Sequence, residues 1–147
     1  MGQLYYEDVL VGAEIPPLER AATTETLVRY HAAAGDWHPI HFDYLYARSV
    51  GFPNVILQGM LKAGWLAQMI TDWAGPKVWV KKFGTQYRQI DVPLDPLICK
   101  GKVTNKHITG GEHLVDLEVW TQNGKGEVTT RGAATVRFPA RNPEVIA

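Results

Sequence analysis

The sequence has a single cysteine, no excess charge of either sign, and no uninterrupted apolar run of membrane-spanning length. Cys99 lies among apolar residues of a strand-like stretch, so the chain can form neither an intramolecular disulfide nor a cysteine metal cluster. This cysteine usage is typical of a reducing compartment, and we expect a cytoplasmic protein. Lysine plus arginine equals aspartate plus glutamate at fifteen each, without a basic tract, which argues against nucleic acid as a partner.

Signals for targeting and for membrane insertion are also missing. Residues 1–10 are acidic and lack the basic region and the apolar run of a signal peptide. The most apolar stretch, residues 60–74, contains Lys62 and Asp72 and is shorter than the roughly 20 residues that span a bilayer. We interpret this stretch as a buried helix and expect no membrane insertion.

The chain length of 147 residues favours a single domain over residues 1–147, and three helices are predicted in its first half. Residues 23–34 carry apolar side chains at helical spacing after threonines that can cap a first turn, and Gly35 follows as a stop. Residues 43–51 predict a short helix with an aspartate as its N-cap. Residues 59–73 are apolar around nearly the whole circumference, so this helix must be enclosed on most sides.

The second half has the composition of β-strands separated by turns. Asn123-Gly124 between the last two strand-like segments favours a tight antiparallel hairpin. Helices followed by meandering strands indicate an α+β domain, and a sheet curled around the apolar helix fits best. The predicted strands are residues 77–90, 96–108, 112–122 and 127–138, with a plausible earlier strand at residues 13–23.

Titratable side chains are concentrated in "GDWHPIH", residues 35–41. On a regular helix Asp36 and His41 would point about 140° apart and could not cooperate. Pro39 prevents a helix from running through the segment, so a loop can bring the two side chains together. A carboxylate and an imidazole that share a water can move protons near neutral pH, which is hydration or dehydration chemistry. The alternative is structural, with Asp36 as a cap and His41 as a satisfied loop histidine.

A second candidate group is Gly59, where the predicted apolar helix begins. Free N–H groups at a helix N-terminus carry the positive end of the helix dipole, and glycine lets a substrate oxygen approach the backbone closely. Gly59 is therefore a candidate oxyanion site, and a donor aimed at an enolate oxygen contributes about 3 kcal/mol to lowering a barrier. The alternative is that Gly59 only permits tight packing where the helix starts.

The stretch "GDWHPIHFDYLYARSVGFPNVILQGML", residues 35–61, resembles the signature of the MaoC-like, (R)-specific enoyl-CoA hydratase family, a branch of the hot-dog fold. The family pattern reads approximately GDxNPxHxDxxxAxxxGFxxxIxHGML and aligns without a gap. Outside this stretch, the order of the predicted elements also agrees. The matching residues are Gly35, Asp36, Pro39, His41, Asp43, Ala47, Gly51, Phe52, Ile56, Gly59, Met60 and Leu61.

The resemblance implies a reaction and a role for each residue of a catalytic trio. Asp36 and His41 would hold and activate a water, and the Gly59 N–H would bind the thioester carbonyl as it becomes enolate-like. The implied substrate is a trans-2-enoyl thioester of coenzyme A or acyl carrier protein, hydrated reversibly to the (R)-3-hydroxyacyl thioester without a metal or redox cofactor. A hot-dog unit has an exposed sheet edge and pairs in this family, so we expect a homodimer or a heterodimer with a related subunit.

Two residues depart from the pattern, which has asparagine at the position of His38 and histidine at the position of Gln58. Neither belongs to the catalytic trio, so these departures bear on substrate identity. Together with Trp37 and Trp65 they form the candidate substrate-binding set, although core or interface packing is the alternative for both tryptophans. His31 is predicted to lie on the first helix near the core, with no catalytic role.

Two other functions stay open at the level of the sequence. A hot-dog thioesterase would use a carboxylate to direct water at the thioester carbonyl, and the presence of both Asp36 and His41 disfavours it. A non-catalytic acyl-binding subunit would keep the fold to complete the pocket of a partner. Loss of Asp36 or His41 would have indicated such a subunit, and both are present.

Overall fold

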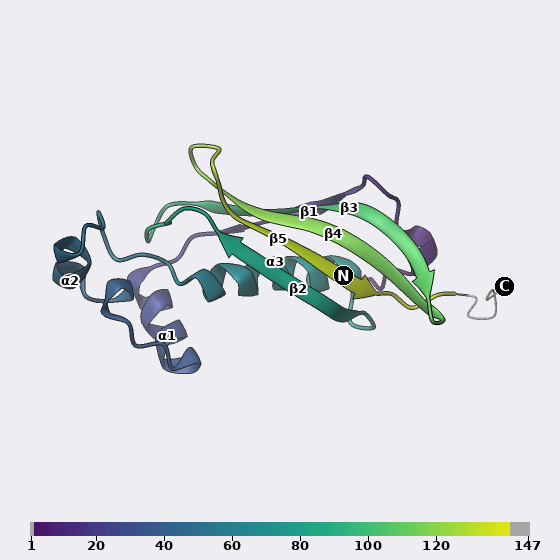
Figure 1. Ribbon diagram of the computed structural model, residues 1–147, viewed down its shortest axis with the longest axis horizontal. Helices are drawn as coiled ribbons and strands as arrows, with labels where there is room; N and C mark the ends of the chain where they lie inside the picture. The colour runs from purple at the N-terminus through teal and green to yellow at the C-terminus, as the bar shows by residue number, and fades with distance from the viewer. Residues whose placement is uncertain (1, 142–147) are drawn as a thin grey trace.

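A computed structural model describes residues 2–141 and contains one five-stranded antiparallel sheet together with several helices (Figure 1). The strand order is β1-β3-β4-β5-β2, so β1 and β2 are the edges. This arrangement confirms the predicted α+β class. The assignment of residues 1–147 to one domain stays a prediction, and residues 1 and 142–147 lie outside the described part. The strands are β1 (Glu14–Arg20), β2 (Trp79–Tyr87), β3 (Leu97–Thr109), β4 (Glu112–Asn123) and β5 (Val128–Arg137).

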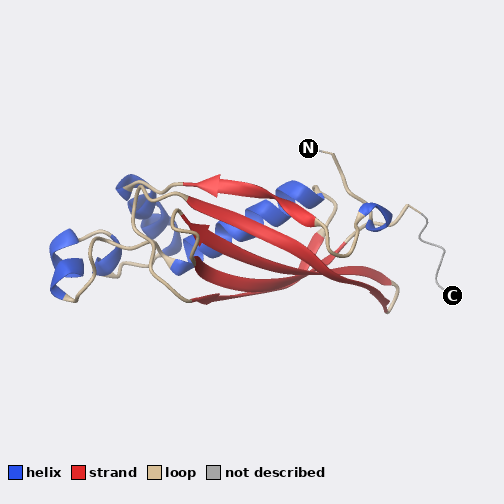
Figure 2. Cartoon of the chain, turned by 90° about the horizontal axis from the view of Figure 1, so that it is seen from above, coloured by secondary structure: helices blue, strands red, loops and turns tan. Residues whose placement is uncertain are grey.

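Helix α3 (Gly59–Ala74) runs along one face of the sheet, as Figure 2 shows from above. Its buried residues Leu66, Met69 and Ile70 pack in one apolar cluster with the inward-facing residues of β3, β4 and β5. Removal of this apolar surface from water is the main force that holds helix and sheet together. This arrangement confirms the enclosed helix that was predicted for residues 59–73, and the observed helix ends one residue later, at Ala74.

The strands lie where the alternating pattern predicts them, with local differences at two turns. Pro16 and Pro17 fall at a register shift in β1, which is tolerated because an edge strand can lose donors to the sheet. The connection between β4 and β5 is a loop of residues 124–127, longer than the expected tight hairpin. The Asn123 side chain causes this difference, because its Oδ1 accepts hydrogen bonds at 3.0 Å from the N–H groups of both Lys125 and Glu127.

Three short helices form a lobe beyond one end of the sheet (Figure 1), and we call it the helical lobe. It comprises α1 (Thr24–Ala34), the 3-10 turn η2 (Pro39–His41) and α2 (Tyr44–Ser49). A second apolar cluster fills the space under these elements. Its buried members are Ala22, Leu27, Ala47, Val55, Leu57, Leu61 and Leu97. The helical lobe thus has an apolar core of its own, which joins it to the start of α3.

The predicted caps set the ends of the helices in this lobe. The Thr23 hydroxyl accepts a hydrogen bond from the Thr26 N–H at 3.1 Å, and Gly35 ends α1 in the left-handed region at φ 69°. The Asp43 carboxylate accepts from the Tyr46 N–H at 3.0 Å and starts α2. Both helices therefore begin and end close to the predicted positions.

Two expectations from composition concern the thiol and the membrane. Cys99 is buried in β3, and burial raises the pKa of its thiol to about 12, so the thiol is protonated at neutral pH. Among residues 2–141, no helix is both long enough and apolar enough to cross a bilayer.

A buried ion pair joins the first turns of α3 to the loop that follows β2. Lys62 Nζ lies 2.6 Å from Asp91 Oδ2, and both side chains are only 2% exposed. The same ammonium group donates a hydrogen bond to the Gln89 carbonyl at 3.2 Å. Removing one partner of a buried ion pair lowers the stability of the fold strongly, because the other charge stays buried without a counter-ion.

We expect Lys62→Met to lower the free energy of unfolding by about 3–5 kcal/mol, since the Asp91 carboxylate would stay buried without its cation. Urea denaturation measures this loss. The matched control is Arg29→Gln, which removes an exposed ion pair with Glu25 and should cost about 0.3–0.5 kcal/mol. A loss below about 1 kcal/mol for Lys62→Met would contradict the dependence on the buried pair.

Candidate active site

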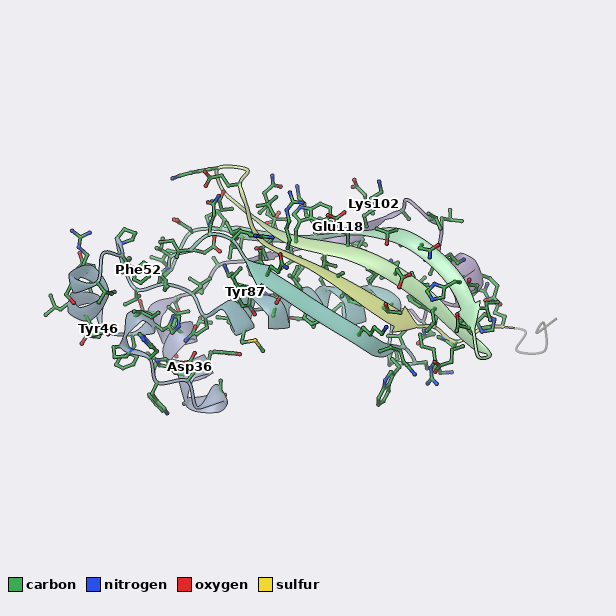
Figure 3. All side chains as sticks on the ribbon, viewed as in Figure 1. Asp36, Tyr46, Phe52, Tyr87, Lys102 and Glu118 are labelled. Carbon is green, nitrogen blue, oxygen red and sulfur yellow. The ribbon has the colours of Figure 1, made fainter. Side chains whose placement is uncertain are left out.

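The first component of the site is the turn that leaves α1. Gly35 ends the helix, and the following Asp36 side chain accepts a hydrogen bond from the His38 N–H at 3.4 Å. The η2 turn, Pro39–His41, then carries the chain back toward α3. Figure 3 shows Asp36 in the helical lobe, outside the sheet. Pro39 at the start of η2 prevents continuation of α1, as predicted, and the direction of the chain reverses here.

The reversal brings Asp36 and His41 together. Asp36 Oδ2 lies 3.9 Å from His41 Nε2, and the imidazole is nearly buried whereas the carboxylate is about half exposed. His41 Nδ1 lies 2.7 Å from the Ile56 carbonyl oxygen. A carbonyl oxygen only accepts, so Nδ1 carries the proton, and Nε2 of the neutral ring is left as a base that faces Asp36.

The second component is the extended segment that leads into α3. The Ile56 N–H donates to the Ile40 carbonyl at 3.1 Å, and the Leu57 N–H donates to the Asp91 carbonyl at 2.8 Å. Gly59 then begins α3, and Gln58 supplies no side-chain cap to its first N–H groups. These groups are therefore available to an acceptor from outside the helix.

Tyr87 is a residue beside the start of α3 that the sequence analysis did not assign to the site. A Cβ on Gly59 would lie 2.7 Å from the Tyr87 ring, so glycine is required for the observed packing. The Tyr87 hydroxyl donates to Met60 Sδ at 3.3 Å, and Figure 3 shows Tyr87 where β2 ends beside α3. Nothing in the spacing of the sequence indicates this contact, because it depends on how β2 docks against α3.

The four candidate substrate-binding residues do not gather in one place. Trp37 is 61% exposed, and His38 is also exposed, with its Nδ1 accepting a hydrogen bond from the Ile40 N–H at 3.4 Å. Gln58 is buried directly before Gly59, and Trp65 is partly buried where the two apolar clusters meet. His38 thus caps the η2 turn, and Trp65 packs against both apolar clusters.

His31 is the second site residue that the sequence analysis did not assign. It is fully buried in α1, and its ring centroid lies 5.8 Å from that of His41 and 5.2 Å from that of Trp37. The only sequence signal was its position four residues before Gly35, on the face that also carries Leu27. Burial lowers the pKa of the His31 imidazole; the Asp36 carboxylate opposes this shift, and His41 reinforces it.

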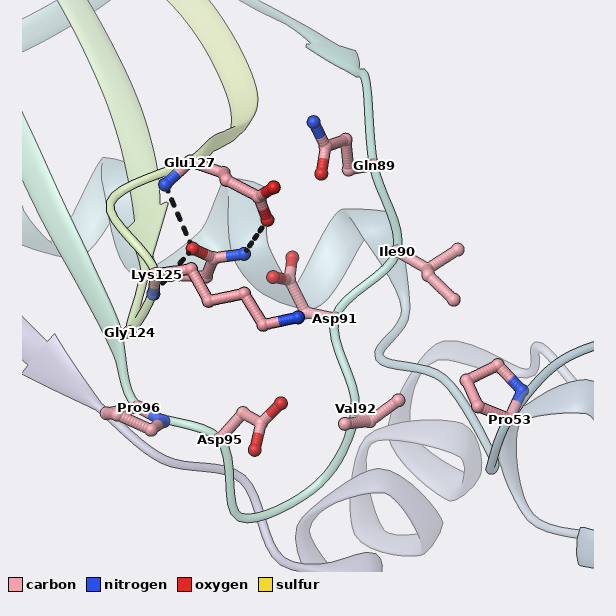
Figure 4. Close-up of a pocket in the computed structure, with 11 residues that line it drawn as sticks. Pro53, Gln89, Ile90, Asp91, Val92, Asp95, Pro96, Gly124, Lys125 and Glu127 are labelled. Carbon is pink, nitrogen blue, oxygen red and sulfur yellow. Dashed lines mark hydrogen bonds between the residues drawn. The ribbon is translucent and has the colours of Figure 1, made fainter.

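A competing site would need a metal-binding cluster or a second cavity. Within residues 2–141, no group of three or more histidine, cysteine or acidic side chains is arranged to hold a metal ion. A cavity of about 490 Å³ lies between the loop after β2 and the β4–β5 turn (Figure 4). Asp36, His41 and Gly59 do not line it. Its walls include Pro53, Gln89, Ile90, Asp91, Val92, Asp95, Pro96 and Lys125.

Comparison with known families decides what this arrangement belongs to. The family model described as the MaoC-like domain matches residues 11–93, more than half of the chain. This chain belongs to the MaoC-like family. The MaoC-like match contains the whole motif of residues 35–61, and it makes the chain a member of a hydratase and dehydratase family with the hot-dog fold.

Individual proteins support the MaoC-like assignment. The beta subunit of 3-oxo-4,17-pregnadiene-20-carboxyl-CoA hydratase from Mycobacterium tuberculosis is 26% identical over 133 residues, which cover 90% of this chain and 98% of that protein. The mitochondrial 3-hydroxyacyl-[acyl-carrier-protein] dehydratase from Arabidopsis thaliana is 35% identical over 63 residues, 43% of this chain and 38% of that protein. The R-hydratase PhaJ1 from Pseudomonas aeruginosa, solved without ligand, is 21% identical with a TM-score of 0.84, covering 95% of this chain and 88% of its own.

The lowered pKa of His31 predicts a pH dependence of stability. In the unfolded chain His31 titrates near 6.5, whereas the folded chain binds this proton only at lower pH. The contribution of neutral His31 is therefore fully present above pH 6.5 and is lost as pH falls through the folded pKa. We expect urea denaturation between pH 7.5 and 5 to show a shallower decline for His31→Gln than for the wild type. Equal slopes for both proteins would contradict this prediction.

Proposed function

We propose that this chain catalyses the reversible addition of water to trans-2-enoyl thioesters of coenzyme A or acyl carrier protein, giving (R)-3-hydroxyacyl thioesters. The observation that carries the proposal is the 3.9 Å separation of Asp36 Oδ2 and His41 Nε2. This distance exceeds a direct hydrogen bond and suits one water that is held by both groups. The fixed proton on His41 Nδ1 leaves Nε2 ready to act on that water.

In the hydration direction, the water oxygen bonds to the β-carbon of the enoyl group while the carbon–carbon double bond breaks. The proton of the water passes to His41 Nε2, which starts without one, and the Asp36–His41 pair then delivers a proton to the α-carbon. Both residues end with the protons they began with, so the net change is the addition of one water. Acid–base catalysis of this kind contributes roughly 10²- to 10⁴-fold to the rate.

Charge that develops on the thioester oxygen during this addition requires a donor. The first N–H groups of α3 at Gly59 have no side-chain cap from Gln58, and they lie at the positive end of the helix dipole. A Cβ at position 59 would collide with the Tyr87 ring, so glycine is needed here for packing as well, and the backbone N–H is the group offered to the oxygen. The Gly59 N–H is our candidate for the group that stabilises the enolate.

In this proposal the acyl group would lie near Trp37 and His38, which are exposed beside the water-binding pair, whereas Gln58 and Trp65 would bound its site from the buried side along α3. Hydration by this route uses protein groups alone and needs no metal or redox cofactor. We expect the chain to act in the cytoplasm, on the basis of its single cysteine.

Assembly is part of the proposal. The free edges of β1 and β2 favour pairing with a second hot-dog unit, either another copy or a related subunit. The Mycobacterium tuberculosis relative is named as a beta subunit, which favours a heterodimer as one form. The same name supports a second candidate function, a non-catalytic acyl-binding subunit that completes the pocket of its partner.

We expect the wild type to remove the enone absorbance of crotonyl-CoA, or of a longer enoyl-CoA, without releasing free thiol. Asp36→Asn and His41→Gln should each lower kcat by roughly 10²- to 10⁴-fold, because each leaves the water with one activating group. Absorbance and thiol release are followed in parallel. Asp95→Asn and His107→Gln, which make the same chemical changes away from the site, should retain the activity.

The outcomes separate the candidate functions. Thiol release in place of enone loss would indicate a thioesterase and contradict hydration. Full activity in either site variant would contradict the assigned roles. If neither reaction occurs even with a related subunit added, the acyl-binding function is favoured over catalysis.

A further inference from the structure

The two components of the candidate site meet at one buried contact. Gln58, directly before Gly59, places its Nε2 3.1 Å from the Leu27 carbonyl and 3.5 Å from His31 Nδ1. Leu27 and His31 lie one turn apart on α1. The side-chain amide of Gln58 therefore contacts a single turn of α1, and the backbone of Gln58 leads into α3. Both Gln58 and His31 are almost fully buried, so water competes little for this contact.

The donors and acceptors fix the state of His31. The Gln58 amide has two N–H groups, one for the Leu27 carbonyl and one for His31 Nδ1, so Nδ1 accepts and the proton of the neutral ring is on Nε2. Burial lowers the pKa of the His31 imidazole, and the His38 backbone lies close enough to the ring to oppose this shift. Among the described residues, Gln58 Oε1 is buried without a hydrogen-bond partner. Buried polar atoms without partners are uncommon and require a reason beyond packing.

His31 also contacts the base of the proposed reaction. The rings of His31 and His41 are nearly perpendicular, at 82°, with centroids 5.8 Å apart. This edge-to-face arrangement is one that aromatic rings prefer. The hydrogen bond from His41 Nδ1 to the Ile56 carbonyl holds one point of the His41 ring and still allows it to tilt. The His31 ring packed against His41 limits that tilt and so keeps Nε2 of His41 directed toward Asp36.

We propose that His31 is a positioning residue that, together with Gln58, fixes the His41 ring relative to the start of α3. The expected effect of His31 on kcat rests on the proposed hydration function, whereas its effect on the orientation of the His41 ring does not. In the family pattern an imidazole stands directly before the glycine, where this chain has Gln58. In this chain His31 supplies an imidazole from α1 to the side chain at that position.

The kinetic test exchanges the two side chains. In His31→Ala we expect kcat for enoyl-CoA hydration to fall about 10- to 100-fold with KM within about threefold, because small misplacement of a catalytic group has such an effect. The double variant His31→Ala/Gln58→His returns an imidazole to the contact from the other side. We expect its kcat to recover to within about threefold of the wild type.

The matched control is Leu27→Ala, which truncates an equally buried side chain one turn away on the same helix. It should lower the Tm at least as much as His31→Ala while kcat stays within about threefold. Equal losses of kcat in both single variants would assign the effect to helix packing and overturn the positioning role. A double variant no more active than His31→Ala, with a Tm like that of the wild type, would overturn it as well.

A second readout does not depend on any substrate. Nitrogen NMR of the histidine side chains in the full chain should show the wild-type His41 as one neutral form, protonated at Nδ1. In His31→Ala we expect the His41 side-chain signals to shift and broaden, because the ring can tilt while its Nδ1 proton still points at the Ile56 carbonyl, and in the double variant we expect them to return to the wild-type positions. Failure of the wild type to hydrate any enoyl-CoA would reject the proposed function alone, whereas an unchanged His41 spectrum in His31→Ala would reject the positioning role.

Discussion

The extended segment of residues 55–58 is the constraint on which both components of the site depend. Its backbone is hydrogen-bonded on two sides, from the Ile56 N–H to Ile40 and from the Leu57 N–H to the loop after β2. Sliding the segment would break both bonds in a buried region, which is costly. The carbonyl of Ile56 orients His41, and α3 begins shortly after the segment ends. His41 and the N-terminus of α3 therefore keep a fixed relation.

The buried ion pair acts on the same segment from the other side. Asp91 uses its backbone carbonyl for Leu57 and its carboxylate for Lys62, so one residue joins the segment to α3. Such a pair adds little net stability compared with an apolar pair of the same size, yet it allows only one arrangement of the groups around it. In this chain the pair holds the loop after β2 against α3, beside the segment of residues 55–58.

The features predicted from the sequence are those that short-range patterns encode. Periodicity located α3 and the strands, caps located the ends of α1 and α2, and Pro39 indicated that Asp36 and His41 would converge. These predictions rest on backbone sterics and on residues close in the chain. The length of the β4–β5 turn was missed because the Asn123 side chain adds hydrogen bonds to two N–H groups of the loop, beside the backbone bonds that Asn123 makes to Gly126 and Glu127.

Contacts between distant segments could not be read in the same way. The approach of His31 to Gln58 depends on how α1 docks against the start of α3, and the sequence contains no periodicity that reports this docking. The Lys62–Asp91 pair is similar, since a single lysine in an apolar helix gives no sign of its partner. The resemblance to a family located the motif, but the residues that support it are particular to this chain's packing.

The contact between Gly59 and Tyr87 also limits how this protein can change during evolution. A side chain at position 59 is compatible with the present backbone only if the ring at position 87 becomes smaller or leaves. The two positions lie on α3 and β2, far apart in the chain, yet position 59 cannot gain a side chain while the ring at position 87 is kept. Among descendants of this sequence, a side chain at position 59 should arise only where position 87 has already changed.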